Sequence, residues 1–290
     1  MRRRSLLAAG SAVLALPATG NAIVLATTTR STLAGTPLGA NFSRLLARVS
    51  RVGLIVQAGG HGLLQHGLLH AAPPPFAGAE LFAGFPFGST AEELQAWVST
   101  PEGRAQWDRV WAGAGYRAFP CGVANVADCI WTSAPLLDAG DLMQARFVGG
   151  GALAREVARA LLTPVGAAPI LLALDLAGAK LLQARGALRH AYAMPLPFGR
   201  LVDCAVPLAT WDAMPQGLRA ALAEASATEF AAGPWTVMTD ACCLPHAVQE
   251  ALGSAMAGAL RRIAANAEGA AMLQTWRAAR VAALDRAGWA

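Results

Sequence analysis

Arg146 is the residue in this sequence whose surroundings most clearly suggest binding chemistry. It ends an apolar segment that begins at Asp141, and the glycine run Gly149–Gly151 follows it before a predicted helix. Arginine presents a planar fork of donors that matches a carboxylate and stays charged at any relevant pH. Glycines allow close approach of the backbone to a ligand, and a helix N-terminus favours an anion. The segment suggests a binding site for a small acid. A surface arginine before an ordinary helix would give the same sequence pattern.

Histidines and adjacent cysteines are the other groups that could do chemistry. His66 and His70 would share one face of a predicted helix over 61–70, a spacing that can hold a metal, with His61 offset. No nearby Asp, Glu or Cys completes such a site, so we expect solvated histidines and no metal. Cys242–Cys243 lie close to His246, but no oriented base or anion hole accompanies them. We therefore predict no catalytic residues, no cofactor and no enzymatic activity.

The first 22 residues read as an export signal. Three arginines, Arg2–Arg4, precede the apolar run Leu6–Leu16, and small residues lead to Ala22. The run is too short to span a bilayer comfortably, and Arg3–Leu7 resembles a twin-arginine signal. We predict cleavage after Ala22 and a periplasmic protein; an uncleaved N-terminal anchor is the alternative.

Charge and hydropathy limit the partners of the exported protein. The formal charge is +5, but residues 1–22 hold three arginines and no acid, which leaves +2. This small excess argues against nucleic-acid binding. No later apolar run reaches membrane-spanning length, so we expect the mature protein not to be embedded in a membrane.

The five cysteines would lie in an oxidising compartment, where disulfides can form. The odd count leaves at least one thiol unpaired. Cys121 and Cys129 are close enough in sequence to pair. Cys242 and Cys243 are expected to be buried or singly paired, because adjacent cysteines rarely bridge each other.

Short predicted strands alternate with predicted helices, which favours an α/β fold. A helix is predicted over residues 90–98. The next helix is expected to begin with Ser99 as its N-cap, with Glu102 completing a capping box. The expected strands are 23–27, 53–57, 82–87, 116–120, 169–173, 188–194 and 201–208. The expected helices are 38–49, 61–70, 90–98, 151–162, 175–185, 215–230, 245–267 and 267–284.

The order of several motifs resembles that of one family, the DctP-type solute-binding proteins of tripartite ATP-independent periplasmic (TRAP) transporters. The similarity runs from the leader to the C-terminus and is strongest over about residues 80–187. The residues that show this similarity are Phe85–Glu93 with Ala96-Trp97, Phe119–Gly122, Trp131, Asp141-Leu142 with Arg146 and the glycines, Gly166–Pro169, and Trp211–Pro215.

The resemblance implies a two-lobed periplasmic-binding-protein fold with a hinge and a helix-rich C-terminal region. It implies a receptor that captures a small organic acid and delivers it to membrane permease subunits. The implied division is 1–22 signal peptide, 23–120 lobe I with a return segment at about 203–235, 121–202 lobe II, and 236–290 as helices packing across the lobes.

The implied ligand-binding residues are Arg146, Trp131, Phe87, Tyr192 and Asn125. Arg146 would hold the carboxylate, and the aromatic rings would shape the rest of the pocket. Ordinary packing is the alternative for each aromatic residue.

The sequence departs from the family at positions beside this site. Two positions that are commonly acidic in relatives are Arg189 and Tyr192 here, and a polar position before Trp131 aligns near Ala127. Metal-assisted carboxylate binding, known in some relatives, is therefore not expected here. Two alternatives stay open: a binding-protein scaffold that lost its ligand site and acts as an interaction protein, and an exported metal or thiol protein.

Overall fold

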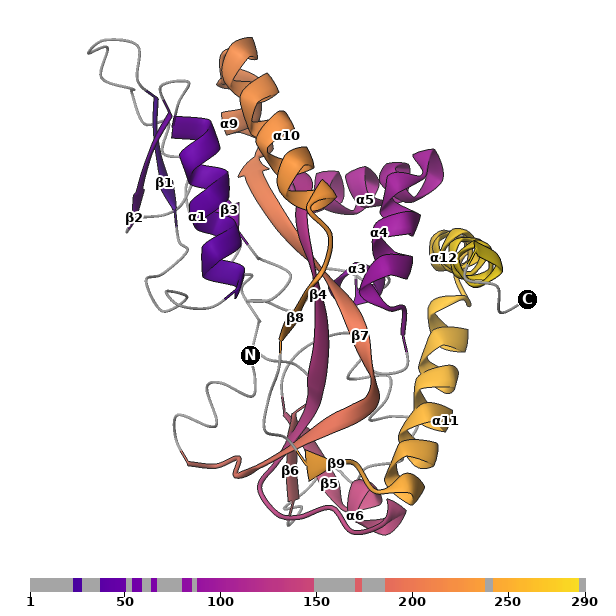
Figure 1. Ribbon diagram of the computed structural model, residues 1–290. Helices are drawn as coiled ribbons and strands as arrows, with labels where there is room; N and C mark the ends of the chain where they lie inside the picture. Colours follow the sequence, from indigo (N-terminus) through magenta and orange to yellow (C-terminus); the bar gives the residue numbers. More distant parts are fainter. Residues whose placement is uncertain are drawn as a thin grey trace, which may run out of the picture.

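Two long antiparallel strands, β4 (Tyr116–Thr132) and β7 (His190–Pro207), form the centre of the protein and run side by side along most of its length (Figure 1). This computed structural model describes residues 23–27, 37–50, 54–58, 64–66, 80–84, 88–148, 170–173, 186–237 and 242–286. Among those residues, no helix is both long and apolar enough to cross a membrane.

The central pair belongs to a seven-stranded mixed sheet. Its main order is β3-β7-β4-β6-β5, with β8 added beside β4 and β9 beside β7. The shorter strands are β3 (Gln65–His66), β5 (Ala145–Val148), β6 (Ile170–Ala173), β8 (Trp235–Val237) and β9 (Cys242–Cys243). A separate two-stranded parallel sheet pairs β1 (Ile23–Thr27) with β2 (Leu54–Ala58).

The β4–β7 ladder is interrupted near its middle. Val126 pairs with Phe198 and Asp128 pairs with Ala193, so four residues of β7 face one residue of β4. Two of those four residues are prolines, Pro195 and Pro197, which have no backbone N–H to donate to a ladder. The sequence-based prediction of two separate strands was wrong in its division, because β7 continues through this interruption.

Helices cover the two ends of the sheet and are joined by a C-terminal pair (Figure 1). Near one end, α1 packs with α10 beside β4, while α4 packs with α5 beside β7. At the other end, α11 contacts α6, and α12 returns to pack on α4 and α5. The bounds are α1 (Pro37–Ser50), α3 (Glu80–Ala83), α4 (Ala91–Ser99), α5 (Pro101–Gly113), α6 (Ala139–Met143), α9 (Leu208–Ala213), α10 (Gln216–Ala231), α11 (His246–Ile263) and α12 (Ala267–Arg286).

The start of α5 corrects one capping prediction. Thr100, not Ser99, is the N-cap: its side-chain oxygen accepts a hydrogen bond of 3.0 Å from the Gly103 backbone N–H, and Pro101 is the first helical residue. Ser99 instead ends α4, where its hydroxyl donates to the Gln95 carbonyl. The pattern located the helix boundary but placed the cap one residue early.

Two glycines bring the segment before α4 directly onto β7. Gly84 has φ +75°, and a Cβ there would lie 2.0 Å from the backbone oxygen of Gly199. Gly199 in turn donates its N–H to the Ser89 carbonyl at 2.6 Å. Only residues without a side chain allow this approach, so the α4 N-terminus is fixed against β7 just beyond the interrupted ladder.

Two hydrophobic cores fill the interior. The larger core includes Phe82, which stacks on Trp97 with ring centroids 4.5 Å apart and meets Trp107 edge-on at 5.3 Å. Trp97 and Trp107 are therefore core residues. The smaller core joins α1, β3 and α10 to the central strands through residues such as Leu45, Leu64 and Leu222.

Two predicted elements differ from the structure. Residues 64–66 lie in or beside strand β3, not in a helix, and His66 is buried, not solvated. Pairing with β7 overrides the local helical pattern there. Residues 80–83 form α3, where an extended segment was expected from residue 82. The predicted helices 151–162 and 175–185, and the leader, lie outside the described residues.

Candidate functional site

Arg146 lies on β5, which follows the short helix α6. Asp138 caps α6: its carboxylate accepts from the backbone N–H of Gly140 (2.7 Å), and Asp141 completes a capping box. Leu142 and Ala145 are fully buried and fix this helix-to-strand turn against the core. The apolar segment before Arg146 is therefore a capped helical turn that leads into a strand.

The strand register places Arg146 and Trp131 on the same face of the sheet. Trp131 on β4 pairs with Ala173 on β6, and Arg146 on β5 pairs with Leu171 on β6. Paired residues share a face and alternate residues along a strand return to it. Since residues 171 and 173 share a face, Arg146 and Trp131 do too, about 12 Å apart across two strand spacings and two residues along the strands.

The two side chains differ in exposure in a way that suits a binding surface. Trp131 is only 4% exposed, whereas Arg146 is exposed. In the described part of the chain, no carboxylate pairs with Arg146. A buried ring beside an available guanidinium can bind a small molecule with an apolar body and a carboxylate.

Tyr192 lies on the opposite face. It pairs with Ile130, the neighbour of Trp131, and both Ile130 and Tyr192 belong to the larger core. The Tyr192 hydroxyl accepts a hydrogen bond of 2.7 Å from the Leu136 backbone N–H. We therefore assign Tyr192 to the packing of this region and omit it from the candidate site.

Asn125 and Phe87 complete the predicted set. The Asn125 side-chain oxygen accepts a hydrogen bond of 3.3 Å from the Ala91 backbone N–H, the first residue of α4. This contact holds the start of α4 on β4. The Asn125 side chain is half-buried and lies near the interruption of the β4–β7 ladder. Phe87 lies outside the described residues, as do the glycines 149–151. The structure thus brings Arg146 and Trp131 to one surface and places Tyr192 elsewhere.

A buried polar network, which the sequence did not reveal, lies between α1, β3, β4 and α10. Asn41 is at its centre: its amide nitrogen donates to the Cys121 carbonyl (2.8 Å) and to Glu229 (3.3 Å), and its oxygen contacts His66 Nε2 at 2.8 Å. Burial lowers the pKa of His66 from 6.5 to about 3. These residues come from distant parts of the chain, so no local spacing could have predicted the network.

The cysteine predictions need correction. Cys121 and Cys204 are buried free thiols, and Cys242 and Cys243 are exposed free thiols. Cys121 therefore does not pair with Cys129, and the adjacent cysteines are neither buried nor paired. Burial, then the neighbouring Cys204, Asp203 and Glu229, raises the pKa of the Cys121 thiol. Such thiols are poor nucleophiles because the thiolate is disfavoured.

The histidines and acids do not assemble a metal site in the described part of the chain. No group of three His, Cys, Asp or Glu side chains there could hold a metal ion. At the two positions that are commonly acidic in relatives, Arg189 is exposed and Tyr192 faces the core.

Known proteins resemble this chain in structure. No protein-family profile and no curated protein sequence matches it. A TRAP periplasmic solute-binding protein from Pseudoalteromonas atlantica, with bound sodium and pyruvate, aligns over 92% of this chain and 96% of its own, at 17% identity and a TM-score of 0.65. One from Bordetella bronchiseptica, with calcium and picolinate, aligns over 93% and 94%, at 14% identity and TM-score 0.65.

A third similar structure is a Bordetella pertussis extracytoplasmic solute receptor that binds pyroglutamic acid. It covers 89% of this chain and 100% of its own length, at 14% identity and TM-score 0.61. The expected α/β architecture with two lobes is therefore confirmed, and the proteins that share it are transport receptors. This chain has the two-lobed fold of the periplasmic solute-binding proteins of TRAP transporters.

Proposed function

We propose that this protein captures a small organic acid outside the cytoplasm and delivers it to the permease of a TRAP-type transporter. The proteins of the same fold carry pyruvate, picolinate and pyroglutamic acid, which are all small carboxylic acids. The observation that carries the proposal is the shared sheet face of Arg146 and Trp131. In this role Arg146 binds the carboxylate through paired charge-assisted hydrogen bonds, and Trp131 packs against the rest of the acid.

The hinge is proposed to lie where the β4–β7 ladder is interrupted, between Val126–Asp128 and Ala193–Phe198. Hinges are a few element-terminal or loop residues that absorb backbone rotation. The division into lobe I (23–120, with 203–235) and lobe II (121–202), with 236–290 packed across both, remains a prediction. Closure would bury the ion pair and exclude water from it.

Substitution of Arg146 tests the ligand site. Titration calorimetry of the wild type with a panel of carboxylates that includes pyruvate, malonate and pyroglutamate should identify a ligand. Arg146→Ala is expected to weaken its binding at least a hundredfold, since a carboxylate buried without its cation is strongly disfavoured. Arg146→Lys should recover only part of the affinity because it lacks the planar fork.

Arg261→Ala is the matched control, because Arg261 is also an exposed arginine but lies on α11. Equal affinity of the wild type and the Arg146→Ala variant would contradict the role of Arg146. A wild type that binds no acid of the panel would instead favour the second candidate, an interaction protein on this scaffold. The observation that favours this candidate is that Arg189 and Tyr192 stand where relatives commonly carry acidic residues, and that Tyr192 packs in the larger core.

Export follows from the proposal, because a TRAP receptor works in the periplasm. Residues 1–22 should be absent from protein recovered from the periplasm of a Gram-negative host, and intact-mass measurement would show this. Arg3→Lys with Arg4→Lys should trap the precursor in the cytoplasm, since the twin-arginine receptor reads the arginine pair. Release of an unprocessed protein, or export unaffected by the lysines, would contradict this assignment.

A further inference from the structure

A shallow cavity of about 420 Å³, wide open to solvent, lies at the end of the sheet far from Arg146. It lies between the start of β4, α9 and the first two turns of α10. Arg117 and Trp131 are both on β4, fourteen residues apart, which corresponds to up to about 45 Å of strand. The lining side chains are Arg117, Phe119, Trp211, Gln216 and Arg219, with two alanines of α10.

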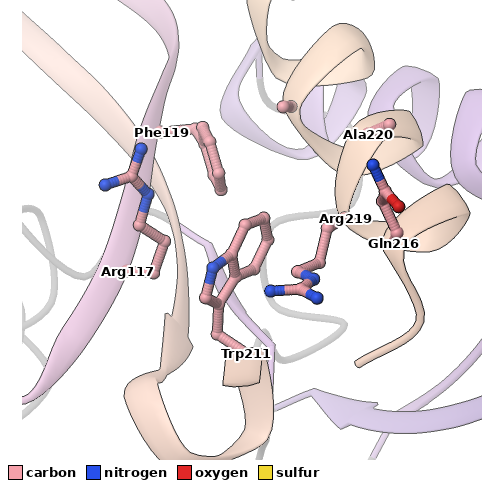
Figure 2. Close-up of a pocket in the computed structure, with 7 residues that line it drawn as sticks. Arg117, Phe119, Trp211, Gln216, Arg219 and Ala220 are labelled. Carbon is pink, nitrogen blue, oxygen red and sulfur yellow. The ribbon is translucent and has the colours of Figure 1, made fainter. Parts of the chain in front are cut away.

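Two aromatic rings and two guanidiniums alternate across this cavity. Phe119 and Trp211 have ring centroids 5.3 Å apart. The Arg117 guanidinium lies over the Phe119 ring at 5.4 Å, and the Arg219 guanidinium lies over the Trp211 ring at 5.9 Å. Figure 2 shows the Trp211 ring between the two arginines, with Phe119 beside it. The rings thereby hold both cations at the cavity.

The positive charge of this cavity is incompletely compensated. Asp108 is shared by Arg104 (3.3 Å) and Arg117 (3.7 Å), and Arg104 also lies near the Phe119 ring. No carboxylate among the described residues pairs with Arg219. The Nε–H groups of Arg117 and Arg219 are buried without a hydrogen-bond partner in the same part of the structure. Buried donors of charged groups are costly when they are left unsatisfied, and a bound anion would offset part of the uncompensated positive charge.

We infer that this cavity is a second binding site, which takes a small aromatic carboxylate. The volume lies in the range of small-molecule sites, which are mostly apolar with a few placed polar groups. The aromatic ring of the ligand would pack against Trp211 and Phe119, and its carboxylate would accept from Arg219. Ala220 and Ala223 leave room beside Arg219 on the same face of α10, because residues at i, i+3, i+4 and i+7 share one face.

Benzoate is the probe, and titration calorimetry is carried out on the Arg146→Ala protein so that the first site does not contribute. Benzoate should bind at one site, at least tenfold more tightly than benzamide, which lacks the charge, and than acetate, which lacks the ring. Arg219→Met should weaken benzoate binding at least tenfold. Ala223→Glu should do the same by placing a carboxylate at the cavity without removing any packing.

Arg261→Met is the matched control, since Arg261 is exposed on α11, and it should leave benzoate binding unchanged. Circular dichroism melting shows whether each variant is folded. If Arg219→Met is unfolded, benzoate binding to Ala223→Glu tests the inference instead. Benzoate binding that disappears in the Arg146→Ala protein would assign benzoate to the first site and overturn the inference. Unchanged affinity in both Arg219→Met and Ala223→Glu would overturn it as well.

Discussion

Replacing Arg44 and Arg48 together with methionine is expected to lower the free energy of unfolding by about 3 kcal/mol. The Glu229 carboxylate is 2% exposed and accepts hydrogen bonds from Arg44 (2.8 Å) and Arg48 (3.1 Å). Without these cations, the buried carboxylate keeps, among the described residues, the Asn41 amide at 3.3 Å. Both guanidiniums are about half exposed, so water screens the two ion pairs. We therefore expect a loss of stability at the lower end of the range for a broken buried pair. Urea unfolding measures the effect.

Adding Glu229→Gln to that double variant should recover most of the lost stability, because a neutral amide is cheaper to bury than an unpaired charge. The control is Arg261→Met with Arg277→Met, which removes two exposed arginines from other helices and should change stability little. A double Arg44/Arg48 variant within about 1 kcal/mol of the wild type would show that the ion pairs contribute no more than typical surface pairs.

Acidification is expected to destabilise the protein through His66, by about 2 kcal/mol between pH 7.5 and 5 and about 4 kcal/mol by pH 3. The pKa of His66 is about 3 in the folded protein and near 6.5 when the chain is unfolded. In this window the unfolded state binds a proton that the folded state does not, so stability falls as the pH falls. His66 Nδ1 is buried without a partner, and a proton there would place an unpaired charge in the core.

His66→Gln isolates this contribution, because its amide nitrogen can replace Nε2 as the donor to Asn41 while nothing titrates. The difference in unfolding free energy between this variant and the wild type should change by about 2 kcal/mol over pH 7.5 to 5. Measurement above pH 5 limits the contribution of the nearby carboxylates Asp203 and Glu229. His246→Gln is the control, since His246 is 82% exposed. An identical pH dependence in His66→Gln and the wild type would contradict the assignment.

Periodicity and capping predicted the elements whose stability is largely local. The helices from residue 215 to 284, the strand at residues 23–27 and the boundary between α4 and α5 were all located to within a few residues. The segment around His66 was misread because its small apolar residues fit a helix, whereas distant pairing with β7 makes it a strand. The prediction of two strands, 188–194 and 201–208, in place of β7 was wrong because β7 includes Pro195 and Pro197 at the point where its ladder with β4 is interrupted.

The candidate site depended on information that only the register supplies. Arginine chemistry and family resemblance singled out Arg146 and Trp131, but their shared face follows from pairing through β6. The same register moved Tyr192 to the core, one residue out of phase with Trp131. The cavity beside Arg219 was missed because its side chains come from β4, α9 and α10, which are up to about a hundred residues apart in sequence.

Thr132 pairs with His190, so the chain between them leaves β4 and returns to β7 at one rung of the ladder, after adding β5 and β6 to the same sheet. This part is therefore a long loop inserted between the two central strands. Closing a loop of this length costs about 3–4 kcal/mol of chain entropy before the first contact between the strands forms. Pairing of β4 with β7 bears at least that cost wherever it begins, so the helices at either end can form before the two strands pair.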